Sequence, residues 1–225
     1  MCGRFALSAK TDLVEKLLPD FHFEEELEER YNYAPGQQVP VVLDEEPTLG
    51  IKIKWGLVPF WAKDPKIGYR MINARSETVA EKPSFRNSFK KKRCLVIADG
   101  YYEWRKEENS KVKTPFFIRM KDGKPFTMAG LWEKWKSPEG KMLTTTTIIT
   151  TEPNPMLSEI HDRMPSIILP EDRILWLSPE TNTKHLKNML LQYPEESMET
   201  WEVSNHVNSS KNDDKLCVEP IGGLF

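Results

Sequence analysis

Short runs of β-branched and aromatic residues recur along the chain between Gly, Pro and Asp positions, a pattern typical of β-strands. The clearest runs predict strands at residues 39–43, 51–55, 94–98, 101–105, 115–119, 127–132 and 143–151. Shorter runs predict strands at residues 166–169, 201–203 and 216–220. Because these runs dominate the chain, the pattern indicates an α+β fold with a mainly antiparallel, barrel-like β core and short peripheral helices.

Helical spacing of apolar residues is confined to short segments. Ser8 is placed to cap a helix over residues 9–18 that ends before Pro19 and turns Leu13, Leu17 and Leu18 inward. The remaining predicted helices are at residues 76–81, 84–91, 171–177 and 181–192. The stretch 56–93, which includes two of them, is long for a connection between strands, and such connections are usually functional. The polar residues 209–215 predict a mobile loop.

Composition indicates an ordinary globular chain. It has 225 residues, of which 39% are hydrophobic and 29% charged, which fits one domain over residues 1–225. The three cysteines form no C-x-x-C pair, so we expect reduced thiols, a cytoplasmic location, and neither a structural metal nor a cofactor. No apolar run approaches the roughly 20 residues of a membrane span, and no secretory signal is visible, so we expect no membrane association.

Charge is distributed unevenly along the chain. Residues 50–93 contain twelve Lys or Arg residues against three acidic ones, although the whole chain has a net charge of −2. Aromatic residues, including Phe60 and Trp61, alternate with these cations. Rings that stack on bases beside cations that bind phosphates suit single-stranded nucleic acid. The alternative is a solvated basic face whose aromatic residues belong to the core.

The most informative residue is Cys2. Removal of Met1 would leave a cysteine with a free α-amine beside its thiol, and such a 1,2-aminothiol converts an aldehyde first to a Schiff base and then to a stable thiazolidine ring. The chemistry is feasible near neutrality, because an α-amine titrates at about 7.7–8.0 and a thiol at about 8.5. The alternative is that Cys2 is a small apolar residue packed under the first strand.

Two further residues have the chemistry of acid–base catalysts. Glu103 follows the strongly apolar residues 94–98 closely, and partial burial would raise the pKa of its carboxyl toward neutrality, although a structural ion pair is the alternative. His161 lies at a turn-like junction between a short helix and a strand. A lone histidine is also commonly structural, with Asp162 and Arg163 pairing with each other or with the backbone.

Residues 73–77 read Asn-Ala-Arg-Ser-Glu and are predicted to lie just before a helix. The side-chain amide of Asn73 can orient a neighbouring group, and the guanidinium of Arg75 can bind a phosphate with two hydrogen bonds. A turn followed by a helix cap would use similar residues, so both interpretations stay open from these residues alone.

Together these motifs resemble the SOS-response-associated peptidase (SRAP) family, whose members are described as abasic-site processing proteins. The resemblance spans essentially the whole chain. It is based on residues 1–5 (MCGRF), 31–36 (YNYAPG), 55–59 (WGLVP), 73–78 (NARSET), the strand of Glu103, 129–132 (AGLW) and 160–165 (IHDRMP).

The resemblance implies an SRAP fold and a covalent sensor of abasic sites in single-stranded DNA. In such a sensor Cys2, freed of Met1 by an aminopeptidase or by the protein itself, forms a thiazolidine with the ring-opened sugar. Asn73 would orient the Cys2 amine, and Glu103 would assist proton transfer in forming and reversing the link. His161 would act on the Schiff base and can support β-elimination.

The DNA-binding residues implied by the resemblance are Arg4 and Arg75 for phosphates and Trp61 for base stacking, with Phe60 and Arg163 as further candidates. Phe60 stands where relatives often have a second tryptophan, which puts strand separation by this pair in doubt. The protein would act as a monomer, associate with the nucleoid when bound to DNA, and have a replication-associated partner. The alternatives are a cysteine-type peptidase using Cys2 and His161, and a noncovalent binder of single-stranded or modified DNA that does not need Cys2.

Overall fold

The computed structural model describes residues 2–107 and 112–222. The strands in these residues are β1 (Arg4–Leu7), β2 (His22–Phe23), β3 (Arg30–Tyr33), β4 (Gln38–Leu43), β5 (Leu49–Trp55), β6 (Asn73–Arg75), β7 (Arg93–Ala98), β8 (Gly100–Lys106), β9 (Lys113–Met120), β10 (Phe126–Lys136), β11 (Met142–Thr151), β12 (Met164–Pro165), β13 (Ile167–Ile168) and β14 (Met198–Glu202). The α-helices are α1 (Thr11–Leu17), α2 (Arg86–Lys91), α3 (Pro155–Ser158), α4 (Arg173–Leu177) and α5 (Thr183–Asn188). The 3₁₀-helices are η1 (Pro65–Arg70), η2 (Pro170–Asp172), η3 (Glu195–Ser197), η4 (Asn205–Asn208) and η5 (Lys215–Cys217). None of the helices described is long and apolar enough to cross a membrane.

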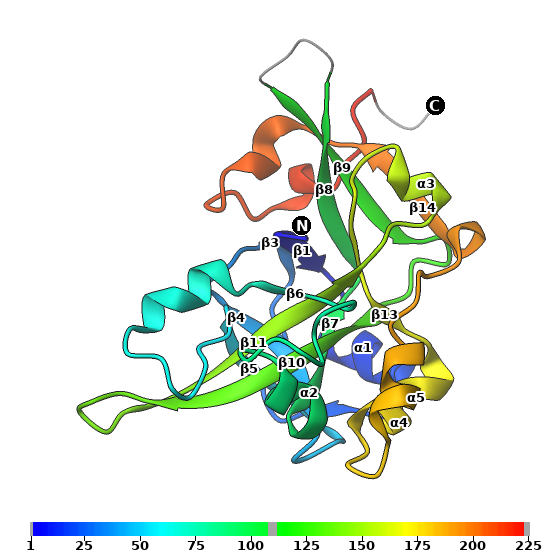
Figure 1. The fold of residues 1–225 in the computed structure, drawn as a ribbon. Helices are drawn as coiled ribbons and strands as arrows, with labels where there is room; N and C mark the ends of the chain where they lie inside the picture. Colours follow the sequence, from blue (N-terminus) through cyan, green and yellow to red (C-terminus); the bar gives the residue numbers. More distant parts are fainter. Residues whose placement is uncertain (1, 108–111, 223–225) are drawn as a thin grey trace.

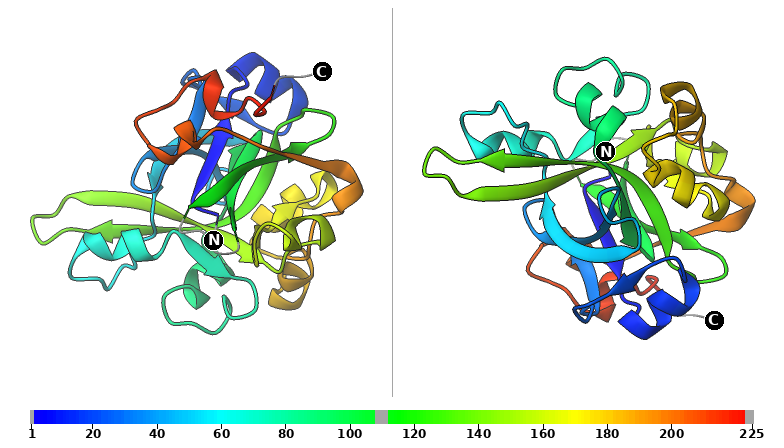
Figure 2. Two further views of the ribbon diagram at one scale, coloured as in Figure 1. Left: turned by 90° about the horizontal axis from the view of Figure 1, so that it is seen from above. Right: turned by 90° about the horizontal axis from the view of Figure 1, so that it is seen from below.

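A closed five-stranded barrel forms the centre of the molecule (Figure 1). Its strands follow the order β5–β4–β7–β10–β11, in which each neighbouring pair is antiparallel. The ring closes because β11 also pairs with β5, in parallel, with Thr145 opposite Lys54 and Thr146 opposite Trp55. The α+β, barrel-like prediction is therefore confirmed, with one parallel pair among the antiparallel ones. The β10–β11 hairpin extends well beyond the barrel (Figure 2).

A second sheet packs beside the barrel and positions the start of the chain. Its strand order is β14–β9–β8–β1–β3. β1 is antiparallel to β8, with Arg4 opposite Tyr102 and Phe5 opposite Tyr101. The chain therefore runs from Cys2 directly along the strand that carries Glu103.

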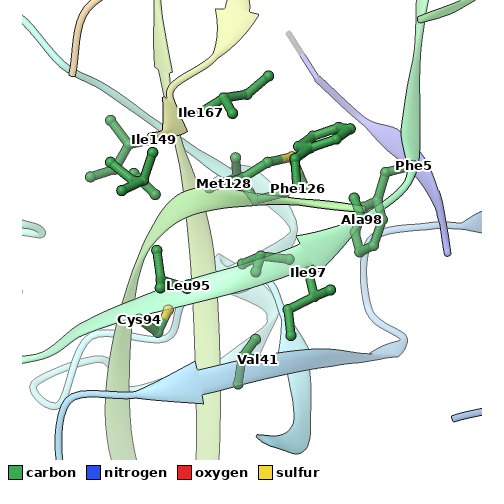
Figure 3. Close-up of a cluster of buried hydrophobic side chains, with 14 of the residues drawn as sticks. Phe5, Val41, Cys94, Leu95, Ile97, Ala98, Phe126, Met128, Ile149 and Ile167 are labelled. Carbon is green, nitrogen blue, oxygen red and sulfur yellow. The ribbon is translucent and has the colours of Figure 1, made fainter. Parts of the chain in front are cut away.

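Buried apolar side chains from both sheets form one core (Figure 3). All six residues of β7 are buried. This is expected for the apolar run at residues 94–98, and the buried guanidinium of Arg93 donates to the carbonyls of Trp176 and Ser178. Phe5 of β1 reaches into this core and stacks on Tyr33, with ring centroids 4.9 Å apart. Core packing thus fixes β1, the strand next to Cys2, against the barrel.

The predicted strands of the barrel and of β8 and β9 are confirmed within a few residues, whereas predictions for the shorter segments are mixed. Strands 166–169 and 201–203 correspond to β13 and β14. The prediction of a strand at residues 216–220 is wrong. The chain forms η5 there, and Pro220 is joined to Val203 by an isolated bridge. The predicted helices 84–91 and 181–192 exist as the shorter α2 and α5, and the predicted helix 171–177 exists as η2 followed by α4.

The long connection between β5 and β7 differs from its prediction. Residues 76–81 form successive turns rather than a helix, and residues 73–75 before them form β6. β6 pairs in parallel with β11, with Asn73 opposite Ile148 and Arg75 opposite Thr150. The side chains of Asn73 and Arg75 are therefore held on a strand of the barrel sheet, not at the beginning of a helix.

The predicted cap of the first helix is also wrong. α1 begins at Thr11, its N-cap residue is Lys10, and no side chain caps it. The hydroxyl of Ser8 instead donates to Asp99 Oδ2 at 2.7 Å, which also accepts from the backbone N–H groups of Ser8 and Ala9. Leu13 of the expected apolar face is exposed. Ser8 therefore ties the end of β1 to the β7–β8 turn.

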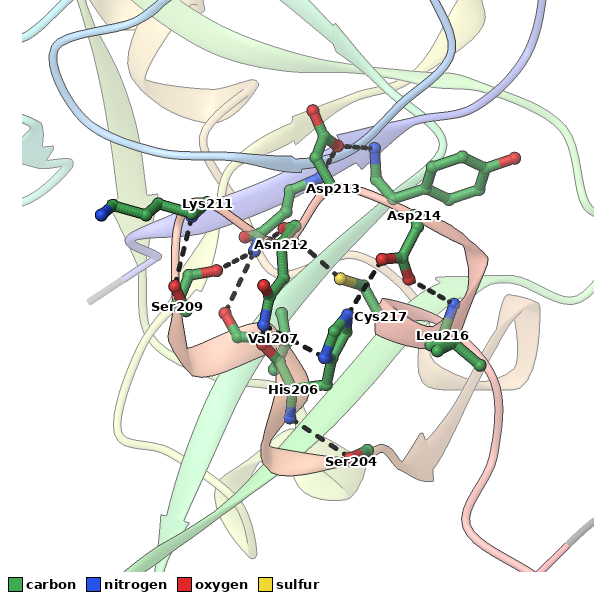
Figure 4. Close-up of polar contacts among 12 residues, drawn as sticks. Ser204, His206, Val207, Ser209, Lys211, Asn212, Asp213, Asp214, Leu216 and Cys217 are labelled. Atoms are coloured by element: carbon green, nitrogen blue, oxygen red, sulfur yellow. Dashed lines mark hydrogen bonds and ion pairs between the residues drawn. The ribbon is translucent and has the colours of Figure 1, made fainter.

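Residues 209–215, predicted to be a mobile loop, are held by many polar contacts (Figure 4). Asp213 accepts hydrogen bonds from the backbone N–H groups of Tyr31 and Asn32, at 2.6 and 2.9 Å. The side-chain amide of Asn32 donates to the carbonyls of Ser209 and Asn212. The polar side chains of this segment thus satisfy the backbone of β3, and that prediction is wrong.

Candidate functional site

Glu103 lies near the middle of β8 and is only 2% exposed. Burial raises the pKa of its carboxyl to about 8, and the negative charge of Asp162 acts in the same direction. At neutral pH a group with this pKa is mostly protonated and gives up its proton readily, which is the property of a general acid–base catalyst. The sequence-based prediction of a desolvated carboxyl is therefore consistent with the structure.

Cys2 is fully buried beside this carboxyl. Continuing the antiparallel register of β1 and β8 past Arg4–Tyr102 brings Gly3 opposite Glu103. Sγ of Cys2 makes a weak hydrogen bond of 3.9 Å to the carbonyl oxygen of Arg4. Burial raises the pKa of the thiol strongly, and the nearby Glu103 carboxylate adds to that effect. The thiol is therefore protonated at neutral pH, and its reaction requires a base.

Tyr101 is a component of this site that the sequence reasoning missed. Tyr101 and Glu103 are two residues apart on one strand, so their side chains point to the same face. The Tyr101 hydroxyl is buried and makes no hydrogen bond to any residue in the described part of the chain. Burial raises the pKa of its phenol well above the usual value, with Cys2 and Glu103 contributing. A thiol, a phenol and a carboxyl thus share one enclosed space.

His161 completes this group from the loop between α3 and β12. Its Nε2 lies 3.7 Å from Glu103 Oε2, and its Nδ1 accepts the backbone N–H of Arg163 at 3.1 Å. Oδ1 of the exposed Asp162 lies 2.9 Å from the same Nδ1. Burial lowers the pKa of His161. The ring is therefore neutral at pH 7. Nδ1 cannot accept from Arg163 and donate to Asp162 at the same time; in the tautomer in which Nδ1–H donates to Asp162, the lone pair of Nε2 faces Glu103.

Arg163 anchors the His161 loop. Its guanidinium binds both carboxylate oxygens of Glu77, at 2.6 and 3.1 Å, and the carbonyl oxygen of Thr150 at 2.5 Å. A planar guanidinium that donates two hydrogen bonds to one carboxylate has a fixed orientation. Arg163 therefore links the His161 loop to β11 and to the turn that follows β6.

The two residues of β6 differ in exposure. Asn73 Nδ2 reaches the carbonyl oxygen of Ile148 at 3.5 Å, while its buried Oδ1 has no hydrogen-bond partner among residues 2–107 and 112–222. That oxygen is available to accept a hydrogen bond from a ligand or from an amine. Arg75 is exposed on the same strand, where its guanidinium can reach a polyanion.

Arg4 of β1 is occupied by protein contacts. Its guanidinium donates to Asn32 Oδ1 and to the carbonyl of Val207, each at 2.8 Å, and to the carbonyl of Asn208 at 3.1 Å. These bonds hold β1, immediately after Cys2, against the C-terminal segment. The predicted contact of Arg4 with phosphate stays a prediction, made by a group that already has three protein partners.

The aromatic residues predicted to contact DNA lie on the segment between β5 and η1. Phe60 is 59% and Trp61 50% exposed, which is unusual for side chains so apolar. Trp61 also borders a hollow of about 430 Å³ lined with the cations Lys63, Lys66 and Arg70. This combination of exposed rings and cations has the composition of a single-strand binding surface.

The β10–β11 hairpin supports that segment. The indole N–H of Trp135 donates to the carbonyl of Ala62 at 2.7 Å, and Trp135, Val58 and Ala62 form a small buried cluster. A second constraint is the close approach of Gly56 and Gly68, since a Cβ on Gly68 would lie 2.5 Å from the carbonyl oxygen of Gly56. The exposed rings thus project from a supported loop.

One set of side chains has the composition of a metal site. Ligand atoms of His206, Asp214 and Cys217 lie within 4.8 Å of one another, and these donor types suit zinc. However, Nε2 of His206 already bonds Asp214 at 3.0 Å, its Nδ1 lies 3.1 Å from Asn212 Nδ2, and burial raises the pKa of the Cys217 thiol. The group is satisfied as a hydrogen-bonded cluster (Figure 4), and the expectation of no metal stays a prediction.

The structure thus brings together Cys2, Glu103 and His161 of the predicted residues, with Tyr101 added. Asn73 and Arg75 are on β6, which Arg163 links to the His161 loop through Glu77. Phe60 and Trp61 belong to a separate surface on the segment that leads into β6, and Arg4 points to the C-terminal segment. The spacing of two between Tyr101 and Glu103 was the signal that could have identified Tyr101.

The fold described above has known counterparts. A crystal structure of a protein from Bacteroides thetaiotaomicron has the same fold, with a TM-score of 0.87 at 29% identity, covering 97% of this chain and 99% of that one. The chain is 46% identical over 224 residues to the abasic site processing protein YoqW of Bacillus subtilis (strain 168), covering 97% of this chain and 99% of that protein. It is 30% identical over 272 residues to the abasic site processing protein HMCES of Pongo abelii, covering 98% and 76%.

The model of one family, described as SOS response associated peptidase (SRAP), matches residues 1–210. The chain therefore belongs to the SRAP family. This confirms the resemblance seen in the sequence motifs.

Proposed function

We propose that this protein captures abasic sites in single-stranded DNA by forming a thiazolidine with Cys2 after loss of Met1. The observation that carries the proposal is the buried Glu103 carboxyl, with a pKa of about 8, next to the buried thiol of Cys2. An aminothiol beside a group that both gives and accepts a proton near pH 7 suits aldehyde capture. Two similar proteins that bear the name abasic site processing protein support the same assignment.

The amine of Cys2 attacks the sugar aldehyde first, since it needs no thiolate. Protonated Glu103 then donates its proton to the carbinolamine hydroxyl, which leaves as water and gives the iminium ion. The thiol sulfur adds to the iminium carbon, and its proton passes to the Glu103 carboxylate. Glu103 ends as it began, and one water is released in total.

Neighbouring residues have distinct roles in this proposal. The buried Oδ1 of Asn73 accepts a hydrogen bond from the attacking amine and so orients its lone pair. The neutral His161 ring, 3.7 Å from Glu103, exchanges a proton with it and acts on the Schiff base in reversal or β-elimination. The Tyr101 hydroxyl donates a hydrogen bond to Glu103 while that group is a carboxylate.

DNA contact is assigned to the exposed groups. Arg75 binds a backbone phosphate, and Trp61 with Phe60 stacks on bases beside the cations of the same segment. Arg4 and Arg163 were predicted to bind phosphates as well. We assign each a positioning role first, because their guanidinium groups already hold β1 and the His161 loop.

A peptidase function is less well supported by the site. A cysteine peptidase needs a thiol activated by a lowered pKa or by an adjacent base. Burial raises the pKa of the Cys2 thiol instead. The side chain whose charge affects that pKa is Glu103, and His161 is not among the groups that affect it.

The direct test is incubation of the mature protein with single-stranded DNA that contains one abasic site. We expect an adduct that survives denaturation, with a mass equal to protein plus DNA minus one water. Cys2→Ala should abolish the adduct, whereas Cys94→Ala, which removes another buried thiol in the barrel, should keep it. An adduct formed equally by Cys2→Ala, or by protein with an acetylated terminus, would overturn the proposal.

The alternatives give different results in the same assay. A noncovalent binder would retain abasic DNA on a native gel with Cys2→Ala as well as wild type and release it on denaturation. A peptidase would cleave peptides without DNA.

A further inference from the structure

A pocket of about 420 Å³ lies away from Cys2, between the β9–β10 turn, β13 and the start of α4. Its inner wall is apolar and includes Phe126, Ile167 and Ile168, each at most 3% exposed. A cavity of this size with a largely apolar wall and a few polar groups is typical of a small-molecule site.

Arg173 is the polar group that distinguishes this pocket. Its side chain lines the pocket, yet the residue is only 7% exposed. Nε donates to Thr127 Oγ1 at 3.3 Å. Its two terminal nitrogens make no hydrogen bond, and no carboxylate lies within 4.0 Å of the guanidinium, among the described parts of the chain.

The terminal nitrogens are open to the pocket and not sealed in the core, since they are not among the enclosed polar atoms that lack a partner. A charge on so buried a residue is normally paired, because its removal from water costs several kcal/mol. Asp20 and Glu171 attract the guanidinium from a distance, but both are exposed. The terminal nitrogens of Arg173, which form the rigid fork that suits a carboxylate or phosphate, are therefore left for a molecule in the pocket.

The mouth of the pocket adds positive charge. Lys121 and Lys124 line it together with Asp122, which forms an ion pair of 2.9 Å with Lys124. Nζ of Lys121 donates to the carbonyl of Glu196 at 2.8 Å, and no carboxylate of residues 2–107 or 112–222 forms an ion pair with it. The partly buried Tyr193 also lines the pocket.

We propose that this pocket binds a small organic anion, with its carboxylate or phosphate on Arg173 and its apolar body against Phe126 and Ile168. The proposal does not depend on the chemistry of Cys2. The pocket does adjoin the reactive site, because the ring of Phe126 packs edge-on against that of Tyr101, with centroids 6.4 Å apart. An occupant would therefore be separated from Tyr101 of the reactive site by the ring of Phe126.

The test is titration of the full-length ¹⁵N-labelled protein with benzoate, phenyl phosphate, inorganic phosphate and benzyl alcohol, followed by amide chemical shifts. We expect saturable shifts at Phe126 and Ile168 with benzoate or phenyl phosphate. Tighter binding of one of these two identifies the charged group as carboxylate or phosphate. Benzyl alcohol, which lacks the charge, and inorganic phosphate, which lacks the apolar body, should bind at least tenfold more weakly.

Two variants test the role of the pocket itself. Arg173→Gln should weaken the anion at least tenfold, and the exposed Lys184→Gln, outside the pocket, should not. Because Arg173→Gln changes a buried residue and can affect folding, Ser197→Trp is the second variant. The Ser197 side chain is exposed at the pocket wall and makes none of the observed hydrogen bonds, so tryptophan there should block entry and leave the melting temperature unchanged.

Equal binding of benzyl alcohol, or unchanged anion binding in a folded Arg173→Gln or Ser197→Trp protein, would overturn the proposal. So would the absence of saturable shifts with either organic anion. None of these outcomes bears on abasic-site capture, which is measured by the adduct.

Discussion

Nε2 of His161 and Oε2 of Glu103 lie 3.7 Å apart, and burial pushes the pKa values of the two groups in opposite directions. The pKa of the acid rises and that of the base falls, so both groups are uncharged at pH 7. A small approach of the two side chains would allow a hydrogen bond through which a proton could pass. This pair is therefore ready for proton transfer without a buried charge in the resting state.

The raised pKa of Glu103 makes stability depend on pH. The folded protein holds this proton up to a pH of about 8, while the unfolded chain releases it near about 4.3. The free energy of unfolding should therefore fall with rising pH between these values. Relative to Glu103→Gln, we expect a slope of up to about 1.4 kcal/mol per pH unit. Urea unfolding of both proteins at pH 5, 6, 7 and 8 measures it, and parallel curves would contradict the raised pKa.

The same group should shape the rate of adduct formation. The Cys2 amine must be deprotonated to attack, so the rate rises with pH, while Glu103 must be protonated to release water, so the rate falls above pH 8. The wild type should give a bell-shaped profile, and Glu103→Gln should lose the descending limb and react about 10²–10⁴-fold more slowly. Single-turnover rates from pH 6 to pH 10 check this. A descending limb that persists in Glu103→Gln would assign it to another group.

Adjacent tyrosines provide a matched pair of variants. The hydroxyl of Tyr101 is buried without a partner, so Tyr101→Phe should not lower stability but should slow adduct formation. The hydroxyl of Tyr102 donates to the carbonyl of Tyr31 at 2.6 Å. Tyr102→Phe should therefore lower stability by about 1 kcal/mol and leave the rate unchanged. Thermal unfolding and single-turnover kinetics measure the two effects, and a Tyr101→Phe protein with wild-type kinetics would remove Tyr101 from the mechanism.

Salt dependence separates a positioning role of Arg163 from phosphate binding. Arg75→Gln should weaken binding of single-stranded DNA and reduce the slope of log affinity against log salt by about 0.7, the value for one lost phosphate contact on a single strand. Arg163→Gln should leave that slope unchanged and instead slow adduct reversal, because the His161 loop loses its anchor on Glu77. Fluorescence anisotropy from 50 to 300 mM salt provides the slopes. An equal loss of slope in both variants would assign Arg163 to phosphate.

Trp61 should contribute binding energy without contributing stability. It is half exposed, so Trp61→Ala should change the free energy of unfolding little and weaken single-stranded DNA binding by about 1–3 kcal/mol. Ile174 on α4 is equally exposed, and Ile174→Ala is the matched control expected to keep full affinity. Equal losses of affinity in both variants would indicate nonspecific apolar contact.

Much of the fold could be predicted because its strands have local signals. β7 contains an uninterrupted apolar run at residues 94–98, β10 contains the apolar and aromatic run at residues 126–132, and β11 is long and rich in β-branched residues, so each was identified from its own residues. β6 has only three residues, too few to show a period, and its pairing with β11 is a contact between distant parts of the chain. Its assignment as the approach to a helix was wrong for that reason.

The site was predicted in part for similar reasons. Glu103 and Cys2 have chemical properties that their types and surroundings suggest. The role of Arg4 could not be predicted from its surroundings in the sequence, because the guanidinium binds the carbonyls of Val207 and Asn208, some two hundred residues away. Serine is a common N-cap residue, so the sequence predicted that Ser8 caps the first helix. Its hydroxyl instead donates to the carboxylate of Asp99, which is distant in the sequence.

The long-range anchoring of Arg4 has a consequence for biosynthesis. Cys2 and its strand leave the ribosome before Val207 and Asn208, whose carbonyls hold that strand and which lie more than two hundred positions after Arg4. The nascent chain therefore leaves the segment around Cys2 open to methionine trimming until those residues have been made. Enclosure of that segment beside Glu103 follows only after they have emerged.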